Sequence, residues 1–183
     1  MTAYLALLRG INVGGRQRMS MADLRALLAE LGHTEVLTHL QSGNALFSSP
    51  RTDSGGLAAE LEQAITQELG MSVRCLVRAH GDLERIVGGN PLARVATDPA
   101  RLLVTFLNVK PDAALLSTID PEAYLPEQFA AGEQEIYTWF PDGVRDAKLT
   151  NVFFEKKLGG KKADIVGTAR NWNTVTKLLG MLS

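Results

Sequence analysis

The sequence has little of what disulfide frameworks, metal centres and membrane proteins need. It contains one cysteine, Cys75, and three histidines among 183 residues. A single cysteine cannot form an intramolecular disulfide, and the histidines are not spaced as metal ligands. No apolar stretch approaches the roughly 18 residues of a membrane-spanning helix, and the N-terminus lacks the basic segment of a signal peptide. We therefore expect a soluble cytoplasmic protein with no metal, no cofactor and no membrane contact.

The sequence also has no large excess of positive or negative charge. The 19 Lys and Arg residues are balanced by 20 Asp and Glu residues, for a formal net charge of -1. Bulk charge therefore gives no support to non-specific nucleic-acid binding. Hydrophobic residues make up 45% of the chain and charged residues 21%, which is typical of globular proteins. The length allows one large domain or two small ones with a buried core.

Hydrophobic periodicity in the first part of the chain predicts the order β-α-β-β-α-β. An apolar run followed by glycines is typical of a strand buried on both faces. Ser20 and Asp23 form a capping-box pattern, and glycines stop both helices. The predicted elements are a strand at 3–9, a helix from Ser20 to Gly32, a hairpin of strands at 35–40 and 45–48, a helix with apolar residues from Leu57 to Leu69, and a strand at 73–77.

The second part repeats this order. Its predicted elements are a strand at 101–107, a helix at 111–116, a hairpin of strands at 127–130 and 135–140, a helix with Leu149, Val152 and Phe153 on its apolar face, a short strand at 163–166, and a tail helix capped by Thr168 that turns Trp172, Val175, Leu179 and Leu182 to the core. We therefore predict an α+β fold of two ferredoxin-like βαββαβ halves, related by internal duplication, with a C-terminal helix. The boundaries are 1–80, a connector at 81–100, 101–167 and 168–183.

The loop after the first strand is the first candidate for an anion site. Gly10 and Gly15 have the spacing of a P-loop, but Arg16-Gln17 stands where Lys-Ser/Thr is required. The spacing also fails the dinucleotide-binding pattern. Glycine backbone together with Arg9, Arg16 and Arg18 still favours anion binding. The alternative is a tight strand exit with solvated arginines.

Two further polar segments share this character. Gln41-Ser42-Gly43-Asn44 presents polar side chains at a predicted hairpin tip, although glycine and asparagine are also what a tight turn requires. Arg170-Asn171-Trp172-Asn173-Thr174 is an unusual helix start, with Arg170, Asn173 and Lys177 on one predicted face. That face is either a binding surface or a solvated one with Trp172 in the core.

One segment raises the possibility of nucleic-acid binding. Tyr137 and Trp139 share a face of a predicted strand. Aromatic side chains beside basic residues are typical of RNA-binding sheets, although no RNP consensus is present. Lysine-rich helix ends are also common solvated surface. The basic residues are Arg145, Lys148, Lys156, Lys157, Lys161 and Lys162.

The motifs together resemble the domain-of-unknown-function 1697 family of bacterial proteins. They are Leu7-Leu-Arg-Gly-Ile-Asn-Val-Gly-Gly, Gln41-Ser-Gly-Asn, Pro141-Asp-Gly, Lys148-Leu and Arg170-Asn-Trp-Asn-Thr-Val, in order along the whole chain. The resemblance implies an α+β protein of duplicated ferredoxin-like halves with no established activity, substrate or cofactor. Ala147 and Ala169 depart from the family pattern, which has Ser and Thr at these places.

We predict that a small anionic ligand or a protein partner binds where the three polar segments meet in space. The predicted site consists of Arg9, Asn12, Gly14, Gly15, Ser42, Gly43, Asn44, Lys148, Arg170, Asn171 and Asn173. A competing hypothesis is an enzyme acting on a phosphorylated or carboxylated metabolite, for which His39 is the one candidate base. A nucleic-acid-binding protein is a second competing hypothesis, and a homo-oligomer formed through exposed sheet edges is a third.

Overall fold

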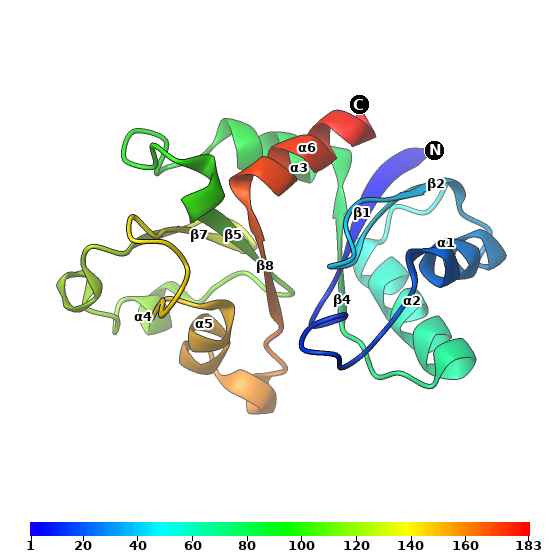
Figure 1. Cartoon of the computed structure of the whole chain (residues 1–183), viewed down its shortest axis with the longest axis horizontal. Helices are drawn as coiled ribbons and strands as arrows, with labels where there is room; N and C mark the ends of the chain where they lie inside the picture. The colour runs from blue at the N-terminus through cyan, green and yellow to red at the C-terminus, as the bar shows by residue number, and fades with distance from the viewer. The chain divides into compact units, whose positions relative to one another are not determined.

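The structure, a computed structural model, describes residues 1–183 and divides into two compact units. Unit 1 comprises Met1–Arg85 and Lys177–Ser183, and unit 2 comprises Ile86–Thr176. The chain passes from one unit to the other within α3 (His80–Gly88) and returns within α6 (Trp172–Leu182) (Figure 1). Two of the fold's helices are therefore shared between the units.

Unit 1 is a four-stranded antiparallel sheet with two helices on one face (Figure 1). The strand order is β2-β3-β1-β4. Apolar residues of α1 and α2 pack on this face, with Leu24, Leu28, Leu57 and Leu61 at its centre. The elements are β1 (Thr2–Leu8), α1 (Met21–Glu30), β2 (Thr34–Thr38), β3 (Asn44–Ser49), α2 (Ser54–Leu69) and β4 (Cys75–Ala79).

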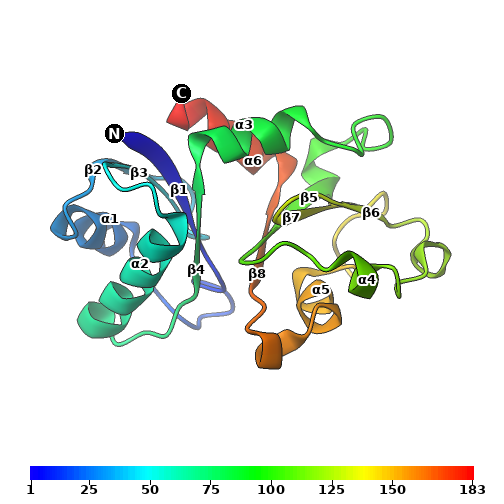
Figure 2. The same cartoon turned by 180° about the vertical axis from the view of Figure 1, so that it is seen from behind.

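Unit 2 repeats this plan with the strand order β6-β7-β5-β8 (Figure 2). Leu107, Ile136, Phe140 and Phe154 lie in the core between its sheet and helices. The elements are β5 (Leu102–Leu107), α4 (Ala113–Leu116), β6 (Gln128–Ala131), β7 (Glu135–Trp139), α5 (Asn151–Lys157) and β8 (Gly167–Asn171), with short 3-10 helices at Pro99–Arg101, Pro121–Tyr124 and Gly160–Ala163. The predicted α+β fold of two ferredoxin-like halves with a C-terminal helix is confirmed.

Strand register shows the internal duplication residue by residue. In unit 1, Leu8 pairs with Cys75, and its N–H donates to the Gly43 carbonyl. In unit 2, Leu107 pairs with Gly167, and its N–H donates to the Gln134 carbonyl. The two halves therefore align at the end of their first strands, although their sequences differ.

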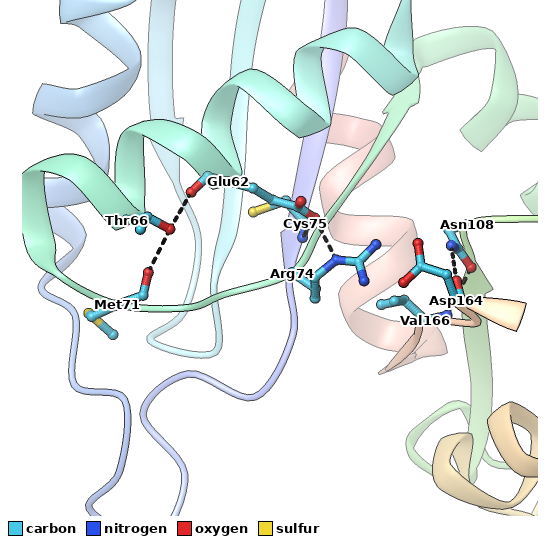
Figure 3. Close-up of polar contacts among 8 residues, drawn as sticks. All are labelled: Glu62, Thr66, Met71, Arg74, Cys75, Asn108, Asp164 and Val166. Atoms are coloured by element: carbon cyan, nitrogen blue, oxygen red, sulfur yellow. Dashed lines mark hydrogen bonds and ion pairs between the residues drawn. The ribbon is translucent and has the colours of Figure 1, made fainter. Parts of the chain in front are cut away.

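Polar side chains fix the strand ends in each unit (Figure 3). In unit 1, the Glu62 carboxylate of α2 accepts from Arg74 Nε at 3.0 Å and from the Cys75 backbone N–H at 2.8 Å. In unit 2, the Asn108 amide donates to the Asp164 carbonyl at 2.6 Å and accepts from the Val166 N–H at 2.8 Å. Apart from the Arg74–Glu62 contact, each bond satisfies a backbone group next to a strand end.

The prediction for the last part of the chain was wrong in its boundaries. The final strand is Gly167–Asn171 rather than 163–166, because Gly160–Ala163 forms a 3-10 turn instead. Thr168 lies in this strand and does not cap α6; the Asn171 carboxamide does so, accepting from the Thr174 N–H at 2.9 Å. Asparagine and threonine are both common N-caps, so periodicity alone did not choose between them.

The predicted apolar face of the helix after Thr150 was also wrong in one residue. Val152 is exposed, whereas Phe154 is fully buried and Phe153 packs against its ring. Leu149 is buried as predicted, but it precedes the helix. In α6, Val175 is fully buried while Trp172, Leu179 and Leu182 are half-buried.

Candidate functional site

The loop after β1 folds into a tight two-residue turn. Val13 and Arg16 form an isolated antiparallel bridge, and the Arg16 N–H donates to the Val13 carbonyl at 3.1 Å. Gly14 and Gly15 between them have φ values of +59° and +75°. Two successive positive φ values are what a type I′ hairpin turn requires, and glycine adopts them without steric cost. The glycines of this loop thus have a conformational role that a P-loop comparison does not reveal.

Asn12 links this loop to the hairpin turn and to the start of α1. Its Nδ2 donates to the Gln41 carbonyl at 2.6 Å and to the Met19 carbonyl at 3.0 Å, and its Oδ1 accepts from the Met19 N–H at 2.9 Å. Asn12 itself has φ +56°, a conformation that asparagine tolerates better than most residues. One side chain therefore holds three segments together.

The Gln41–Asn44 turn packs directly against the same loop. Gly43 has φ +88°, and a Cβ at this position would lie 2.8 Å from Ile11 Cδ1 and 2.8 Å from Leu8 Cβ. Asn44 is fully buried, and its amide donates to the His39 carbonyl at 2.7 Å and to Ser42 Oγ at 3.2 Å. Gly43 and Asn44 thus determine the shape of the turn. Gln41, at the start of the turn, faces an open hollow.

An open depression of about 430 Å³ lies where these segments meet, and we call it the loop depression. A Cβ on Gly15 would lie 3.6 Å from Arg18 Nη2, so the guanidinium lies close to the glycine backbone. Ser20, the N-cap of α1, accepts from the Asp23 N–H at 3.0 Å. The lining residues are Asn12, Gly15, Arg18, Met19, Ser20 and Gln41, and none of them is acidic.

The structure brings part of the predicted site to the loop depression. Asn12 and Gly15 line the loop depression, and Gly14 is the neighbour of Gly15 in the turn. Arg9 does not line it; its backbone N–H donates to the Arg74 carbonyl. Arg18, Ser20 and Gln41 line the depression without being in the predicted site. Arg18 and Gln41 stood in segments that the sequence singled out, and Ser20 was identified only as a helix cap.

The remaining predicted residues belong to unit 2. Lys148 has an exposed side chain, and its backbone N–H donates to the Glu127 carboxylate at 2.9 Å. Asn171 caps α6, and Asn173 is exposed. That these residues meet the loop depression stays a prediction.

Arg170 differs from its predicted environment. It lies in β8 rather than on a helical face with Asn173 and Lys177, and it is 8% exposed. Its Nη1 donates to Thr168 Oγ1 at 2.7 Å and to the Ala169 carbonyl at 2.9 Å. Burial lowers the pKa of the guanidinium to about 10. A buried arginine at this pKa is still charged at neutral pH, and the Thr168 hydroxyl helps to satisfy it.

The aromatic residues proposed for nucleic-acid stacking are inside the protein. Tyr137 is 2% exposed and Trp139 is 7% exposed, and the Tyr137 hydroxyl donates to the Ile86 carbonyl at 2.9 Å. Base stacking requires an accessible aromatic face. The prediction that these two rings form a stacking surface was therefore wrong, although the lysines of α5 and the following turn are exposed.

His39, the one candidate base, lies at the end of β2 and is half-buried. Its backbone N–H donates to the Asn44 carbonyl, so the residue belongs to the hairpin turn. No group of three His, Cys, Asp or Glu side chains is arranged to hold a metal ion. None of the helices is long and apolar enough to cross a membrane.

Comparison with models of protein families identifies the family of this chain. Residues 1–137 match the family model described as "Protein of unknown function (DUF1697)". The chain belongs to this family. The resemblance drawn from the motifs is thereby confirmed, and the matched range includes both the opening loop and the Gln41–Asn44 turn.

A solved structure shares the fold of this DUF1697 protein. It is described as the structure of conserved bacterial protein SP0830 from Streptococcus pneumoniae. The two chains are 23% identical, the match covers 100% of this chain and 99% of the other, and the TM-score is 0.74. At this identity the likeness concerns the fold alone. A comparison with curated proteins returned no match.

Proposed function

We propose that this protein binds a small anion, of the phosphate or carboxylate class, in the loop depression. The observation that carries the proposal is the composition of the lining: one arginine and the polar side chains of Ser20 and Gln41, with no carboxylate, while the Asn12 amide holds the surrounding segments. An arginine guanidinium provides paired N–H donors that match phosphate and carboxylate oxygens. The lining therefore favours a negative ligand over a neutral or cationic one.

The start of α1 adds to this preference. Ser20 lines the depression and is the N-cap of a ten-residue helix. The first N–H groups of a helix and its dipole favour an anion near the N-terminus. Arg18 precedes this helix start by two residues, so a guanidinium and a helix N-terminus adjoin the same hollow.

The internal duplication supplies a comparison within one chain. The connection from β1 to α1 runs from Arg9 to Ser20, whereas the equivalent connection from β5 to α4 runs only from Asn108 to Asp112. In unit 2 the helix N-cap is Asp112, whose own carboxylate accepts from the Ala114 N–H at 2.8 Å. The long arginine-containing loop is thus an addition specific to unit 1, and a short connection satisfies the same fold.

Anion-dependent thermal stability tests the proposal. Inorganic phosphate and citrate, each against sodium chloride of equal ionic strength, are expected to raise the Tm of the wild-type protein. Arg18→Gln removes the charge that lines the depression and is expected to abolish this rise. Arg16→Gln removes an exposed charge from the same loop, outside the lining, and is expected to preserve it.

Two outcomes contradict the proposal. One is a wild-type Tm that responds to phosphate and citrate no more than to sodium chloride. The other is an equal loss of protection in both arginine variants, which indicates a bulk electrostatic effect rather than a site.

A further inference from the structure

A second hollow, unrelated to the loop depression, lies within unit 2. It has a volume of about 250 Å³ and is bounded by the end of α3, the connector that follows, the start of β5 and the first residue of α6. Three of the lining residues, Gly88, Ala93 and Ala96, are small. Trp172 is its one aromatic residue, and no charged residue lines it. We call this hollow the Trp172 pocket.

The Trp172 indole packs near a second aromatic ring. The Tyr137 ring lies beside it, with the ring centroids 6.4 Å apart and an interplanar angle of 48°. The backbone of Trp172 begins α6, which Asn171 caps, and its carbonyl accepts from Thr176 Oγ1 at 2.9 Å. Because Trp172 is only half-buried, part of a large aromatic residue remains accessible.

Small residues leave space beside this ring. A Cβ built on Gly88 would have no heavy atom within 4 Å. Ala93 and Ala96 have no side chain beyond Cβ, so they fill little of the hollow. The Trp172 indole is the largest side chain among the lining residues.

The pocket also contains a defined hydrogen-bonding group. Asn90 lines it, and its Oδ1 accepts from the Leu92 N–H at 2.9 Å. This bond orients the carboxamide and leaves its NH₂ group as a donor. An aromatic wall with a few oriented polar groups is a common composition of a small-molecule site.

We propose that the Trp172 pocket binds a small, uncharged, planar heteroaromatic ring. The ring stacks on the Trp172 indole, and a ring acceptor atom takes a hydrogen bond from the Asn90 NH₂ group. Stacking on an aromatic side chain favours a planar ring over an aliphatic one of similar size. The absence of charged residues from the wall favours a neutral ligand. This assigns a binding role to the Trp172 side chain, within the Arg170–Thr174 segment that the sequence singled out.

Nuclear magnetic resonance of the two tryptophan indoles tests this pocket directly. The two tryptophans, Trp139 and Trp172, are expected to give one indole N–H signal each, and the loss of a signal in Trp172→Phe identifies that of Trp172. Adenine and nicotinamide are the probes, and cyclohexanol is the non-planar control. Both probes are expected to shift the Trp172 signal with millimolar Kd values, as is usual for fragments of this size. The Trp139 signal and the cyclohexanol titration are expected to stay unchanged.

A variant that fills the Trp172 pocket with a larger side chain is the second test of the proposal. Ala93→Leu places a larger side chain in the pocket at an exposed position, and Ala114→Leu makes the same change at an exposed position on α4, outside it. The first is expected to abolish the Trp172 shift, and the second is expected to preserve it. No shift in the wild-type protein, or an undiminished shift in Ala93→Leu, overturns the proposal. Because the readout is local to unit 2, its failure leaves the anion proposal unaffected.

Discussion

Asn44 of unit 1 and Glu135 of unit 2 occupy the same position in the two halves. Asn44 pairs with Leu7 and Glu135 pairs with Phe106, each at the first residue of the second hairpin strand. Both side chains are fully buried. Asn44 donates to the His39 carbonyl, whereas the Glu135 carboxylate accepts from the Glu133 and Gln134 N–H groups. The duplicated fold thus requires a polar group here and accepts opposite hydrogen-bonding roles.

Removing the Asn44 amide is expected to destabilise the protein. Asn44→Ala leaves the His39 carbonyl without its side-chain donor, at a cost of about 1–3 kcal/mol in the free energy of unfolding. Ser42→Ala, at an exposed position in the same turn, is expected to cost less than about 0.5 kcal/mol. Urea unfolding of both variants measures the difference. Equal stabilities would show that the buried amide is not needed.

Gly43 is expected to tolerate no side chain. Gly43→Ala combines a positive φ with a Cβ that meets Ile11 and Leu8, whereas Gly10→Ala has φ +68° but open space around the new Cβ. The positive φ alone costs about 1–2 kcal/mol, and overpacking adds about 1–3 kcal/mol. Chemical denaturation is expected to rank Gly43→Ala as the less stable variant. The reverse order contradicts the packing of the turn against the opening loop.

His33 is expected to make stability fall in mild acid. It is 7% exposed, its ring lies 4.6 Å from that of Phe47, and its Nε2 is 3.5 Å from Glu60 Oε2. Burial lowers the pKa of His33 below its ordinary value of 6.5, against the opposing effect of Glu60. The unfolded chain therefore binds a proton more readily, so stability is full above pH 6.5 and is lost as the pH falls toward the folded-state pKa.

One variant isolates this effect. His33→Gln is expected to flatten the dependence of the unfolding free energy on pH below 6.5. Unfolding curves across this pH range provide the measurement. A His33→Gln variant that keeps the full wild-type slope assigns the acid sensitivity to another group.

Glu127 is expected to control the order of the loop that contains Lys148. Its carboxylate accepts from the backbone N–H groups of Lys148 and Leu149. Glu127→Ala is expected to cost about 2 kcal/mol, since hydrogen bonds to charged groups are among the stronger ones. It is also expected to accelerate hydrogen exchange at these two amides.

Glu133→Ala is the matched control. Glu133 is exposed, and its carboxylate lies 3.5 Å from Lys110 Nζ in an exposed ion pair. Surface pairs of this kind contribute little to stability. If the two variants exchange the Lys148 and Leu149 amides at the same rate, the Glu127 carboxylate does not hold the loop.

Local patterns were sufficient to predict most elements of the fold. The Ser20 cap and the apolar stripe through Leu24 and Leu28 act within a few residues, so the position of α1 follows from the sequence. The last strand was misplaced because Gly167–Asn171 carries little apolar periodicity. Its residues become a strand by pairing with β5, which is distant in sequence.

The candidate site, too, could be predicted from the sequence only in part. The sequence singled out Asn12, Gly15 and the Gln41–Asn44 turn by residue type, but it could not show that Asn12 bonds Gln41 while Arg9 lies outside the depression. It also predicted a stacking surface from Tyr137 and Trp139, because alternation along a strand does not reveal that both of its faces are covered.

The sequence by itself determined a duplicated α+β fold, the positions of most helices and strands, and the glycine- and asparagine-rich segments that need special backbone conformations. Those features follow from local sterics, capping and periodicity. The tertiary structure alone decided which polar side chains line a hollow, which are consumed in turns, and that Trp172 faces a pocket while Tyr137 and Trp139 are buried. Burial and cross-strand pairing join residues far apart in the chain, and no local pattern encodes those contacts.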